Sequence, residues 1–264
     1  MDVVEVDGLR IAYERTGAGP ALVLLHGYVG DGRTTWRRQL DGLGDEFTVV
    51  AWDAPGAGGS SDPPELFGIA GYADCLAGFI DALHLDRPHV LGLSFGGILA
   101  LALHDRHAAV STALVLASAY AGWGGSLPAD VAEARLNQAI VLADLPPAEF
   151  VDVLLPTMFS PETPPDTVAA FRTGMLEFHP AGFRAMARAC TANLRPTLPR
   201  VEVPTLVVHG EKDVRAGLNV ARDLAAAIRG ARLVVLPRAG HLCNIEAPDE
   251  FNDAVRTFLH DTIT

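Results

Sequence analysis

The sequence HVLGLSFGGIL, residues 89–99, predicts a strand, one sharp turn and a helix. Residues 90–93 form an apolar run of strand length, and a helical pattern opens at Gly96 and continues to residue 103. The pattern Gly-x-Ser-x-Gly, centred on Ser94, lies between them. Glycines two residues before and after the serine remove side chains that would clash in so tight a turn. The helix N-terminus favours negative charge at the serine.

This short pattern also fits a glycine-rich loop that carries a surface serine. By composition, Gly-x-Ser-x-Gly occurs by chance in about one chain of this length in ten. The choice between a reactive serine and a plain loop therefore depends on the rest of the chain.

Length and composition bound the possibilities. The chain has 264 residues, 49% of them hydrophobic, which is enough for one large domain or a domain with an insertion. A net charge of -12 argues against nucleic acid and anionic membrane surfaces as partners. The N-terminus has no signal-peptide pattern, and no apolar run approaches the roughly 20 residues of a membrane span. We therefore expect a cytoplasmic protein that acts on a small molecule.

Metal, disulfide and cofactor chemistry have little support. Cys75, Cys190 and Cys243 are odd in number and widely spaced, which argues against a disulfide framework or a zinc site. His104 and His107 share a predicted helix without a third ligand, so a solvated face is favoured over a metal site. We expect neither a metal nor another cofactor.

Apolar runs of strand length alternate with amphipathic helical patterns in both halves of the chain. This alternation is typical of a doubly wound α/β fold, a mostly parallel sheet covered on both faces. The predicted strands are 3–6, 11–14, 21–25, 47–52, 90–93, 113–117, 205–209 and 233–236, and the predicted helices are 36–43, 72–85, 96–103, 220–228 and 250–260.

Residues 122–199 interrupt the alternation. They contain short helical segments broken by prolines and no run typical of a buried strand. Because the strand and helix pattern returns after them, we interpret 122–199 as a helical lid. It is inserted into a core of residues 1–121 and 200–264.

Polar side chains follow five of the predicted strands. His26, Asp53, Ser94, Asp213 and His241 each come within a few residues of the end of an apolar run. Ligands bind at the carboxyl ends of strands in such sheets. Five placements of this kind predict a site at this edge far more strongly than one motif does.

The order serine, acid, histidine along the chain resembles the α/β-hydrolase superfamily over essentially the whole length. The stretches that carry the resemblance are HGY (26–28), DAPGAGGS (53–60), GLSFGG (92–97), GEKD (210–213) and GH (240–241). The stretch AGHLCNIEAP, residues 239–248, is similar to the branch that contains 3-oxoadipate enol-lactonases and small carboxylesterases.

The resemblance implies a Ser-His-Asp mechanism. Ser94 is the expected nucleophile, His241 the base that takes its proton, and Asp213 the acid that fixes the imidazole tautomer. The alternative for Asp213 is a simple cap of the following helix. The backbone N–H groups of Tyr28 and Phe95 are the expected oxyanion donors.

Other residues are expected to support the site. His26 and Gly27 are expected to organise the oxyanion loop, and Asp53 to brace the glycine-rich loop that follows it. Some apolar residues of the lid form either a pocket wall facing Ser94 or simply the core of the lid. They are Trp123, Met158, Phe159, Met175 and Phe178.

We therefore predict a serine hydrolase that cleaves a small carboxylic ester or lactone through an acyl-enzyme. Two alternatives stay open: a carbon–carbon bond hydrolase of ring-cleavage diketones, and a slow-turnover receptor built on a hydrolase fold. The first needs a group that recognises the substrate carboxylate, for which Arg172, Arg184 and Arg188 are candidates if they do not simply face water.

Overall fold

Eight strands form one sheet in the computed structural model, which describes residues 1–263. The strand order is β1-β2-β4-β3-β5-β6-β7-β8. β2 pairs antiparallel with β1 and β4, and all other neighbours are parallel. The strands are β1 (Asp2–Val6), β2 (Leu9–Thr16), β3 (Ala21–Leu25), β4 (Thr48–Trp52), β5 (His89–Leu93), β6 (Leu114–Ala117), β7 (Thr205–Gly210) and β8 (Arg232–Leu236).

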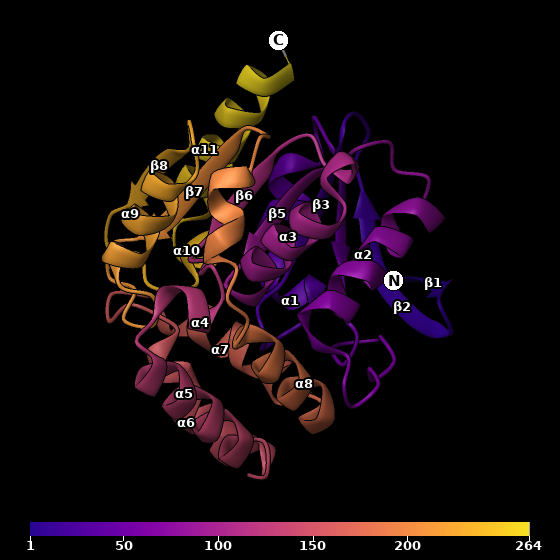
Figure 1. Cartoon of the computed structure of the whole chain (residues 1–264). Coiled ribbons are helices and arrows are strands. Elements are labelled where there is room, and N and C mark those ends of the chain that lie inside the picture. Colours follow the sequence, from indigo (N-terminus) through magenta and orange to yellow (C-terminus); the bar gives the residue numbers. More distant parts are fainter. Residues whose placement is uncertain (264) are drawn as a thin grey trace.

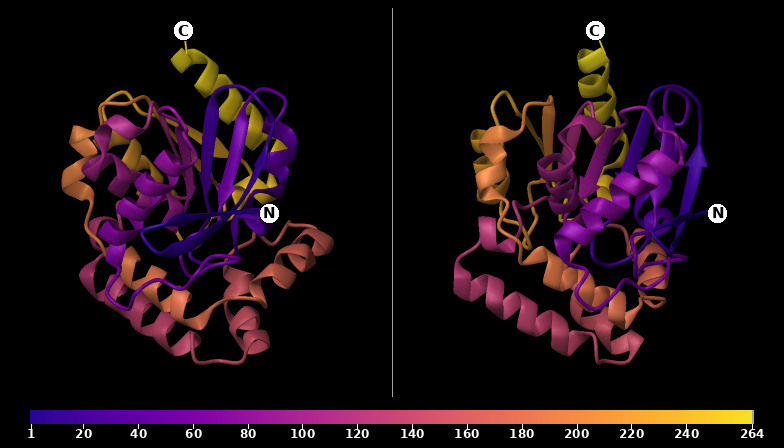
Figure 2. Two further views of the ribbon diagram at one scale, coloured as in Figure 1. Left: turned by 90° about the vertical axis from the view of Figure 1, so that its right-hand side faces the viewer. Right: turned by 45° about the vertical axis from the view of Figure 1, so that its right-hand side comes forward.

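Helices cover both faces of the sheet, as Figures 1 and 2 show. α2 and α3 pack together on one face, and α1 and α11 pack together on the other. The predicted doubly wound α/β fold is therefore confirmed. The core helices are α1 (Gly32–Leu43), α2 (Gly68–Ala82), α3 (Phe95–Arg106), α9 (Leu218–Ala227), α10 (Cys243–Glu246) and α11 (Pro248–Ile263), with a short 3-10 helix η1 (Ala108–Val110).

Burial explains why the sequences of the central strands are continuous apolar runs. Every residue of β4, β5, β6 and β7 is buried, because helices cover both faces of these central strands. The edge strands β1 and β8 are largely exposed or half-buried. The central helix α3 is buried from its first residue to His104, so it is apolar on all sides. His104 lies in this buried stretch, so the expected solvated face is wrong for that residue.

All regular secondary structure between β6 and β7 is helical. Figure 1 shows the helices of residues 123–190 gathered at one end of the sheet, whereas the short helical segment 195–200 contacts α3 and α9. Pro147, Pro165 and Pro180 are each the first residue of a helix, where a missing N–H costs nothing. These prolines therefore begin helices. The elements are α4 (Trp123–Ser126), α5 (Ala129–Leu142), α6 (Pro147–Leu154), η2 (Leu155–Thr157), α7 (Pro165–Met175), α8 (Pro180–Cys190) and η3 (Arg195–Arg200).

We call residues 122–199 the insertion. At the carboxyl ends of the strands, the ring of Phe183 in α8 stacks on Tyr28, three residues after β3. Elsewhere, Thr197 of η3 donates to Asp105 near the end of α3. The interpretation of the insertion as a lid stays a prediction. Residue 264, the last of the predicted core, lies outside the described residues.

The fold buries three histidines of the sheet region, His26, His89 and His209. Burial lowers the pKa of each imidazole. Unfolded histidine has a pKa near 6.5, so below that pH the unfolded chain takes up protons that the folded chain does not. Each group then contributes stability that is complete above about pH 6.5 and is lost as the pH falls toward the folded-state pKa.

His89 is the cleanest test of this pH dependence, because burial is the single cause of its shift. We expect the free energy of unfolding to fall between pH 7 and 5.5, with a slope per histidine of at most about 1.4 kcal/mol per pH unit. His89→Gln is expected to reduce that slope in urea unfolding. Thr112→Ser, which keeps a hydroxyl partner for His89 Nδ1, is the matched control and is expected to leave the slope unchanged. An unaltered slope in His89→Gln contradicts this account.

Candidate active site

Ser94 occupies a strained turn between β5 and α3. Its backbone has φ 52° and ψ -108°, a conformation that non-glycine residues rarely adopt. A Cβ at Gly92 would lie 2.1 Å from the carbonyl oxygen of Gly96, and a Cβ at Gly96 would lie 2.1 Å from that of Leu25. Both glycines are therefore needed for the turn. The predicted strand, turn and helix are confirmed here, and the alternative of a plain glycine-rich loop is wrong.

Asp213 and His241 are joined by a hydrogen bond. His241 Nδ1 donates to Asp213 Oδ2 at 2.7 Å, and both side chains are almost fully buried. The other carboxylate oxygen, Oδ1, accepts from the backbone N–H groups of Arg215 at 2.8 Å and Ala216 at 2.9 Å. Asp213 is thus bound both to His241 and to the start of the loop before α9.

The environment of Asp213 keeps the carboxyl group ionised. Burial alone raises the pKa of Asp213, but the charge and hydrogen bond of His241 and the N–H of Ala216 outweigh it, and the pKa lies below its usual value. A carboxylate only accepts hydrogen bonds, so His241 Nδ1 carries a proton. In the neutral ring, Nε2 is then the nitrogen with a free lone pair.

The loops that carry Ser94 and His241 meet at the end of β6. Ser94 N–H donates to Ala117 O at 2.8 Å, and the next residue, Ser118, has its hydroxyl 3.6 Å from the Cys243 sulfur. Cys243 lies two residues after His241. The structure therefore places Ser94, Asp213 and His241 after the carboxyl ends of β5, β7 and β8.

His209 lies behind Asp213 and was not singled out from the sequence. Its Nε2 lies 3.7 Å from Asp213 Oδ2 and donates to Ala216 O at 2.7 Å. The carbonyl oxygen of Ala216 only accepts, so this nitrogen is protonated. His209 thereby holds the backbone that in turn donates to Asp213. A histidine inside an apolar strand run carries no sequence signal of this role.

Glu246 fastens the His241 loop to the insertion. Its carboxylate accepts from the N–H of Gly240 at 2.9 Å, from the N–H of Ser160 at 2.8 Å and from the hydroxyl of Thr163 at 2.5 Å. Glu246 belongs to residues 239–248, the C-terminal stretch that carries the family resemblance. That membership is the only sequence signal for Glu246, and it does not indicate a role.

The loop after β3 lies beside Ser94. A Cβ at Gly27 would be 3.9 Å from the Ser94 Cβ. His26 Nδ1 donates to Gly27 O at 2.5 Å, and His26 Nε2 accepts from Ala54 N–H at 2.9 Å. His26 therefore joins this loop to the glycine-rich loop after β4.

Asp53 braces the glycine-rich loop after β4, as expected from the sequence, and also binds the first residue of α1. Its Oδ1 accepts from Gly32 N–H and its Oδ2 from Gly59 N–H, each at 2.8 Å. Burial raises the pKa of this carboxyl group. Because both oxygens are occupied by backbone donors, Asp53 has a structural role in the loops.

Two backbone donors next to Ser94 are free. Within residues 1–263, neither the N–H of Tyr28 nor that of Phe95 donates to another residue. Phe95 is the first residue of α3, so its N–H points out of the helix end. Such paired, preformed donors are what a developing oxyanion requires.

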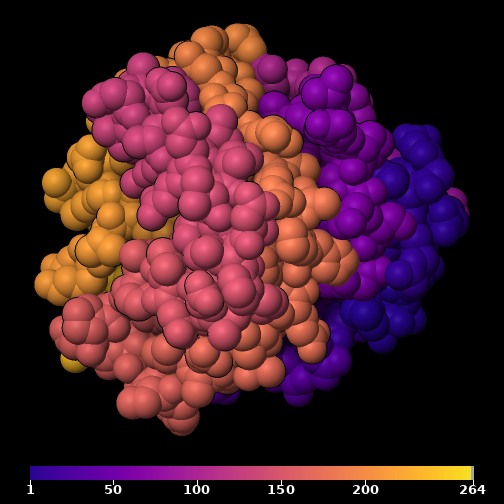
Figure 3. Space-filling model, turned by 90° about the horizontal axis from the view of Figure 1, so that it is seen from below, coloured from indigo at the N-terminus to yellow at the C-terminus, as the bar shows by residue number. Residues whose placement is uncertain are grey.

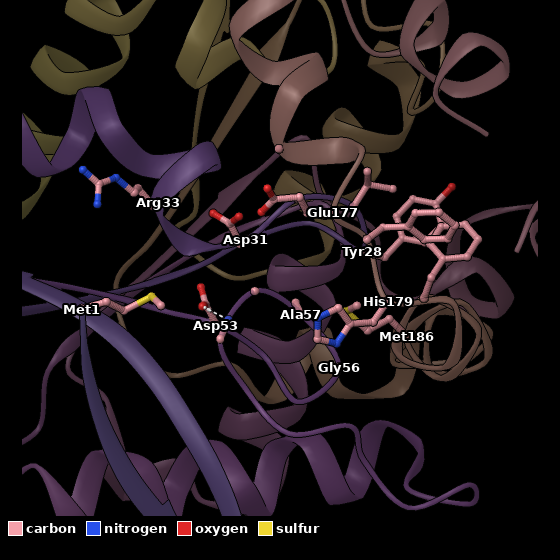
Figure 4. A pocket seen from close by; sticks show the side chains of 17 residues that line it. Met1, Tyr28, Asp31, Arg33, Asp53, Gly56, Ala57, Glu177, His179 and Met186 are labelled. Atoms are coloured by element: carbon pink, nitrogen blue, oxygen red, sulfur yellow. Dashed lines mark hydrogen bonds between the residues drawn. The ribbon is translucent and has the colours of Figure 1, made fainter. Parts of the chain in front are cut away.

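Two cavities meet at Tyr28. The larger, cavity 1, has a volume of about 450 Å³ and extends from Tyr28 to Met1. Figure 4 shows Asp31, Asp53 and Glu177 along it, with the Tyr28 hydroxyl pointing away from them. Cavity 2, about 180 Å³, lies between Tyr28 and the insertion.

The insertion covers the middle of the face seen in Figure 3, with core residues on both sides of it. Ser94 lies in neither cavity wall and is 8% exposed. The ring of Tyr28 packs between Phe183, at a centroid distance of 5.0 Å, and Trp123, at 6.0 Å. Tyr28 lines both cavities.

The residues considered for the pocket wall fall into two groups. Trp123 lines cavity 2 and Phe178 lines cavity 1. The others, Met158, Phe159 and Met175, are buried and line neither cavity. The arginine candidates lie elsewhere: Arg172 pairs with Asp152 at 3.1 Å, Arg184 pairs with Asp144, and Arg188 is exposed.

Neither a metal-binding cluster nor a membrane-spanning helix is present in the described residues. No group of three or more His, Cys, Asp or Glu side chains in residues 1–263 is placed to hold a metal ion. In the same part of the chain, every helix is too short or too polar to cross a membrane. The three cysteines are free and buried.

The chain belongs to the alpha/beta hydrolase family, whose sequence model matches residues 22–254. Serine hydrolase BPHL of Mus musculus is 31% identical over 97% of this chain and 85% of its own length. The curated relatives also include a pyrrolizixenacetamide deacetylase of Xenorhabdus hominickii, 27% identical over 98% of both chains.

Solved structures agree with this assignment. A thermophilic esterase from Thermogutta terrifontis, solved with malate bound, has a TM-score of 0.92 and 27% identity, and each chain is covered completely. The enol-lactonase from Burkholderia xenovorans LB400 has a TM-score of 0.90 and 30% identity, covering 98% of this chain and 100% of its own. The resemblance stated from the sequence is confirmed.

Proposed function

We propose that the chain is a serine hydrolase that cleaves a small carboxylic ester or lactone through Ser94, His241 and Asp213. The bond of 2.7 Å between His241 Nδ1 and Asp213 Oδ2 carries this proposal. It fixes the tautomer in which His241 Nε2 is a base. Together with the strained turn at Ser94, it supplies the two activated groups that acyl transfer needs.

The reaction follows from these groups. Ser94 Oγ attacks the carbonyl carbon while His241 Nε2 takes its proton, and the N–H groups of Tyr28 and Phe95 stabilise the oxyanion. His241 then returns the proton to the leaving alcohol, which leaves an acyl group on Ser94. Water, deprotonated by His241, attacks the acyl carbonyl, and His241 returns that proton to Ser94 Oγ as the bond to the acid breaks. In a lactone, the leaving alcohol stays attached to the acyl chain.

We further propose that the insertion is a lid over this site. The backbone N–H of Leu242, next to His241, donates to Met158 O in the insertion at 3.1 Å. Phe183 and Trp123 of the insertion hold the ring of Tyr28. The insertion thus contacts residues beside both the proposed base and the proposed oxyanion loop.

Turnover of three substrate types tests the proposed function. The substrates are 4-nitrophenyl butyrate, a simple γ-lactone and a dienol-ketone that yields two acids, each with Ser94→Ala as the blank. We expect many turnovers of the ester or the lactone. Turnover of the dienol-ketone alone points to a carbon–carbon bond hydrolase. Absence of any turnover, with a ligand-dependent partner protein, points to the receptor and contradicts the proposal.

A further inference from the structure

Arg215 presents an unpaired positive charge beside Tyr28. Its Nη2 donates to the Tyr28 hydroxyl at 2.6 Å, and its Nη1 donates to Thr157 Oγ1 at 2.7 Å. Both partners are neutral, and the side chain is half-buried. A guanidinium group has five N–H donors, so three donors of Arg215 remain free for another acceptor.

A second arginine, Arg135 of α5, lies against the same loop. Its Nη1 donates to the Tyr120 hydroxyl at 2.9 Å, and its Nη2 donates to the backbone oxygen of Arg215 at 2.7 Å. Tyr120 OH donates to that same oxygen at 2.6 Å. These contacts fix the position of Arg135 without neutralising it.

Neither arginine forms an ion pair with a carboxylate of residues 1–263. Asp213 is close in sequence, but its oxygens are taken by His241 and by two backbone N–H groups. By contrast, Arg172 and Arg184 of the insertion are paired with aspartates. Two partly buried cations that form no ion pair within residues 1–263 favour an anion in the cavity that both line, although the chain as a whole carries a charge of -12.

Both arginines line cavity 2. The cavity also touches Tyr28 and Trp123, so it reaches the proposed oxyanion loop. Its volume of about 180 Å³ is roughly the volume that six water molecules occupy in liquid water. That space holds a carboxylate and a short carbon chain, and arginine binds carboxylates with parallel N–H donors.

We propose that Arg135 and Arg215 form a carboxylate-binding subsite, so that the preferred substrate is an ester or lactone that carries a carboxylate. This inference rests on the proposed hydrolase function, because the ester or lactone group of the substrate would react at Ser94. The subsite itself depends only on the two arginines and cavity 2. Its anion lies on the side of Tyr28 away from cavity 1, whose wall carries Asp31, Asp53 and Glu177.

Binding is tested first, without catalysis. Calorimetry on Ser94→Ala measures the affinity for adipate and for hexanoamide, a neutral chain of the same length. We expect adipate to bind at least tenfold more tightly, because charge-assisted hydrogen bonds to arginine are the strong ones. Adding Arg135→Gln or Arg215→Gln is expected to weaken adipate binding about tenfold or more, whereas adding Arg172→Gln leaves it unchanged.

Specificity is tested next, by kcat/KM for the mono-4-nitrophenyl ester of adipic acid against 4-nitrophenyl hexanoate. We expect Arg135→Gln to lower the ratio of these two values about tenfold or more, and Arg135→Lys, which keeps the charge, to restore most of it. Arg172→Gln is again the matched control. Thermal unfolding of each variant shows that it is folded.

The outcomes separate the two proposals. The subsite is overturned if adipate and hexanoamide bind equally and no arginine variant changes the ratio of kcat/KM. Hydrolysis of 4-nitrophenyl hexanoate in that case still supports the hydrolase. Arginine-dependent adipate binding without turnover of either ester overturns the hydrolase and supports the subsite.

Discussion

Replacing Ser94 with alanine is expected to lower kcat for 4-nitrophenyl butyrate by about 10,000-fold or more. The proposed mechanism forms its acyl intermediate on Ser94 Oγ, and no acylation occurs without that atom. The residual rate over water comes from the oxyanion donors of Tyr28 and Phe95 and from binding. The substitution removes one oxygen from a side chain that is 8% exposed, so the fold is expected to stay intact.

Ser118 provides the matched control for this variant. It directly follows β6 as Ser94 follows β5, and it too has a positive φ, of 44°. Ser118→Ala is therefore expected to keep kcat within tenfold of the wild type. Steady-state kinetics on both variants, with thermal unfolding beside them, makes the comparison. A Ser94→Ala variant that keeps a tenth of the wild-type kcat contradicts the role of Ser94.

Asp213→Asn is expected to lower kcat by about 10,000-fold for a different reason. The N–H groups of Arg215 and Ala216 both donate to Asp213 Oδ1, so the oxygen of an asparagine must face them. Its NH₂ group then faces His241 Nδ1 and donates to it. His241 is forced into the tautomer with the proton on Nε2, which cannot take a proton from Ser94.

Asp144→Asn is the control for the loss of a carboxylate, because Asp144 is exposed and pairs with Arg184 on the insertion. We expect it to leave kcat within about twofold, as surface ion pairs contribute little. Kinetics above pH 9, where hydroxide assists proton removal, are expected to recover part of the activity of Asp213→Asn. Full activity of Asp213→Asn at pH 7 leaves Asp213 with only the role of a helix cap.

The sequence was sufficient for the sheet and for the turn at Ser94. Central strands buried on both faces produce uninterrupted apolar runs, so β4 to β7 are visible without any alignment. The turn has a local sequence signal, because Gly92 and Gly96 lie two residues before and after Ser94. A Cβ at Gly92 would meet Gly96 itself, whereas a Cβ at Gly96 would meet Leu25 of the neighbouring strand β3. Asp213 follows such a run in β7, whereas His241 follows the apolar run of the partly exposed edge strand β8.

The remaining parts of the site depend on contacts between distant residues. Arg215 meets Tyr28 across 187 positions of sequence, and Arg135 meets the Arg215 backbone across 80. Composition does not show which arginines are paired: Arg172 and Arg184 were candidates for anion recognition, yet both are neutralised by aspartates. The role of Glu246 also depends on a contact between distant residues, because its partner Ser160 is 86 positions away.

The most direct test of the central claim is the intact mass of the protein after exposure to a fluorophosphonate. Such a reagent labels a serine only when a neighbouring base activates it. We predict a single adduct on the wild type, no adduct on Ser94→Ala, and slow labelling of His241→Ala. An adduct that persists on Ser94→Ala, or a folded wild-type protein that stays unlabelled, contradicts the assignment of Ser94 as an activated nucleophile.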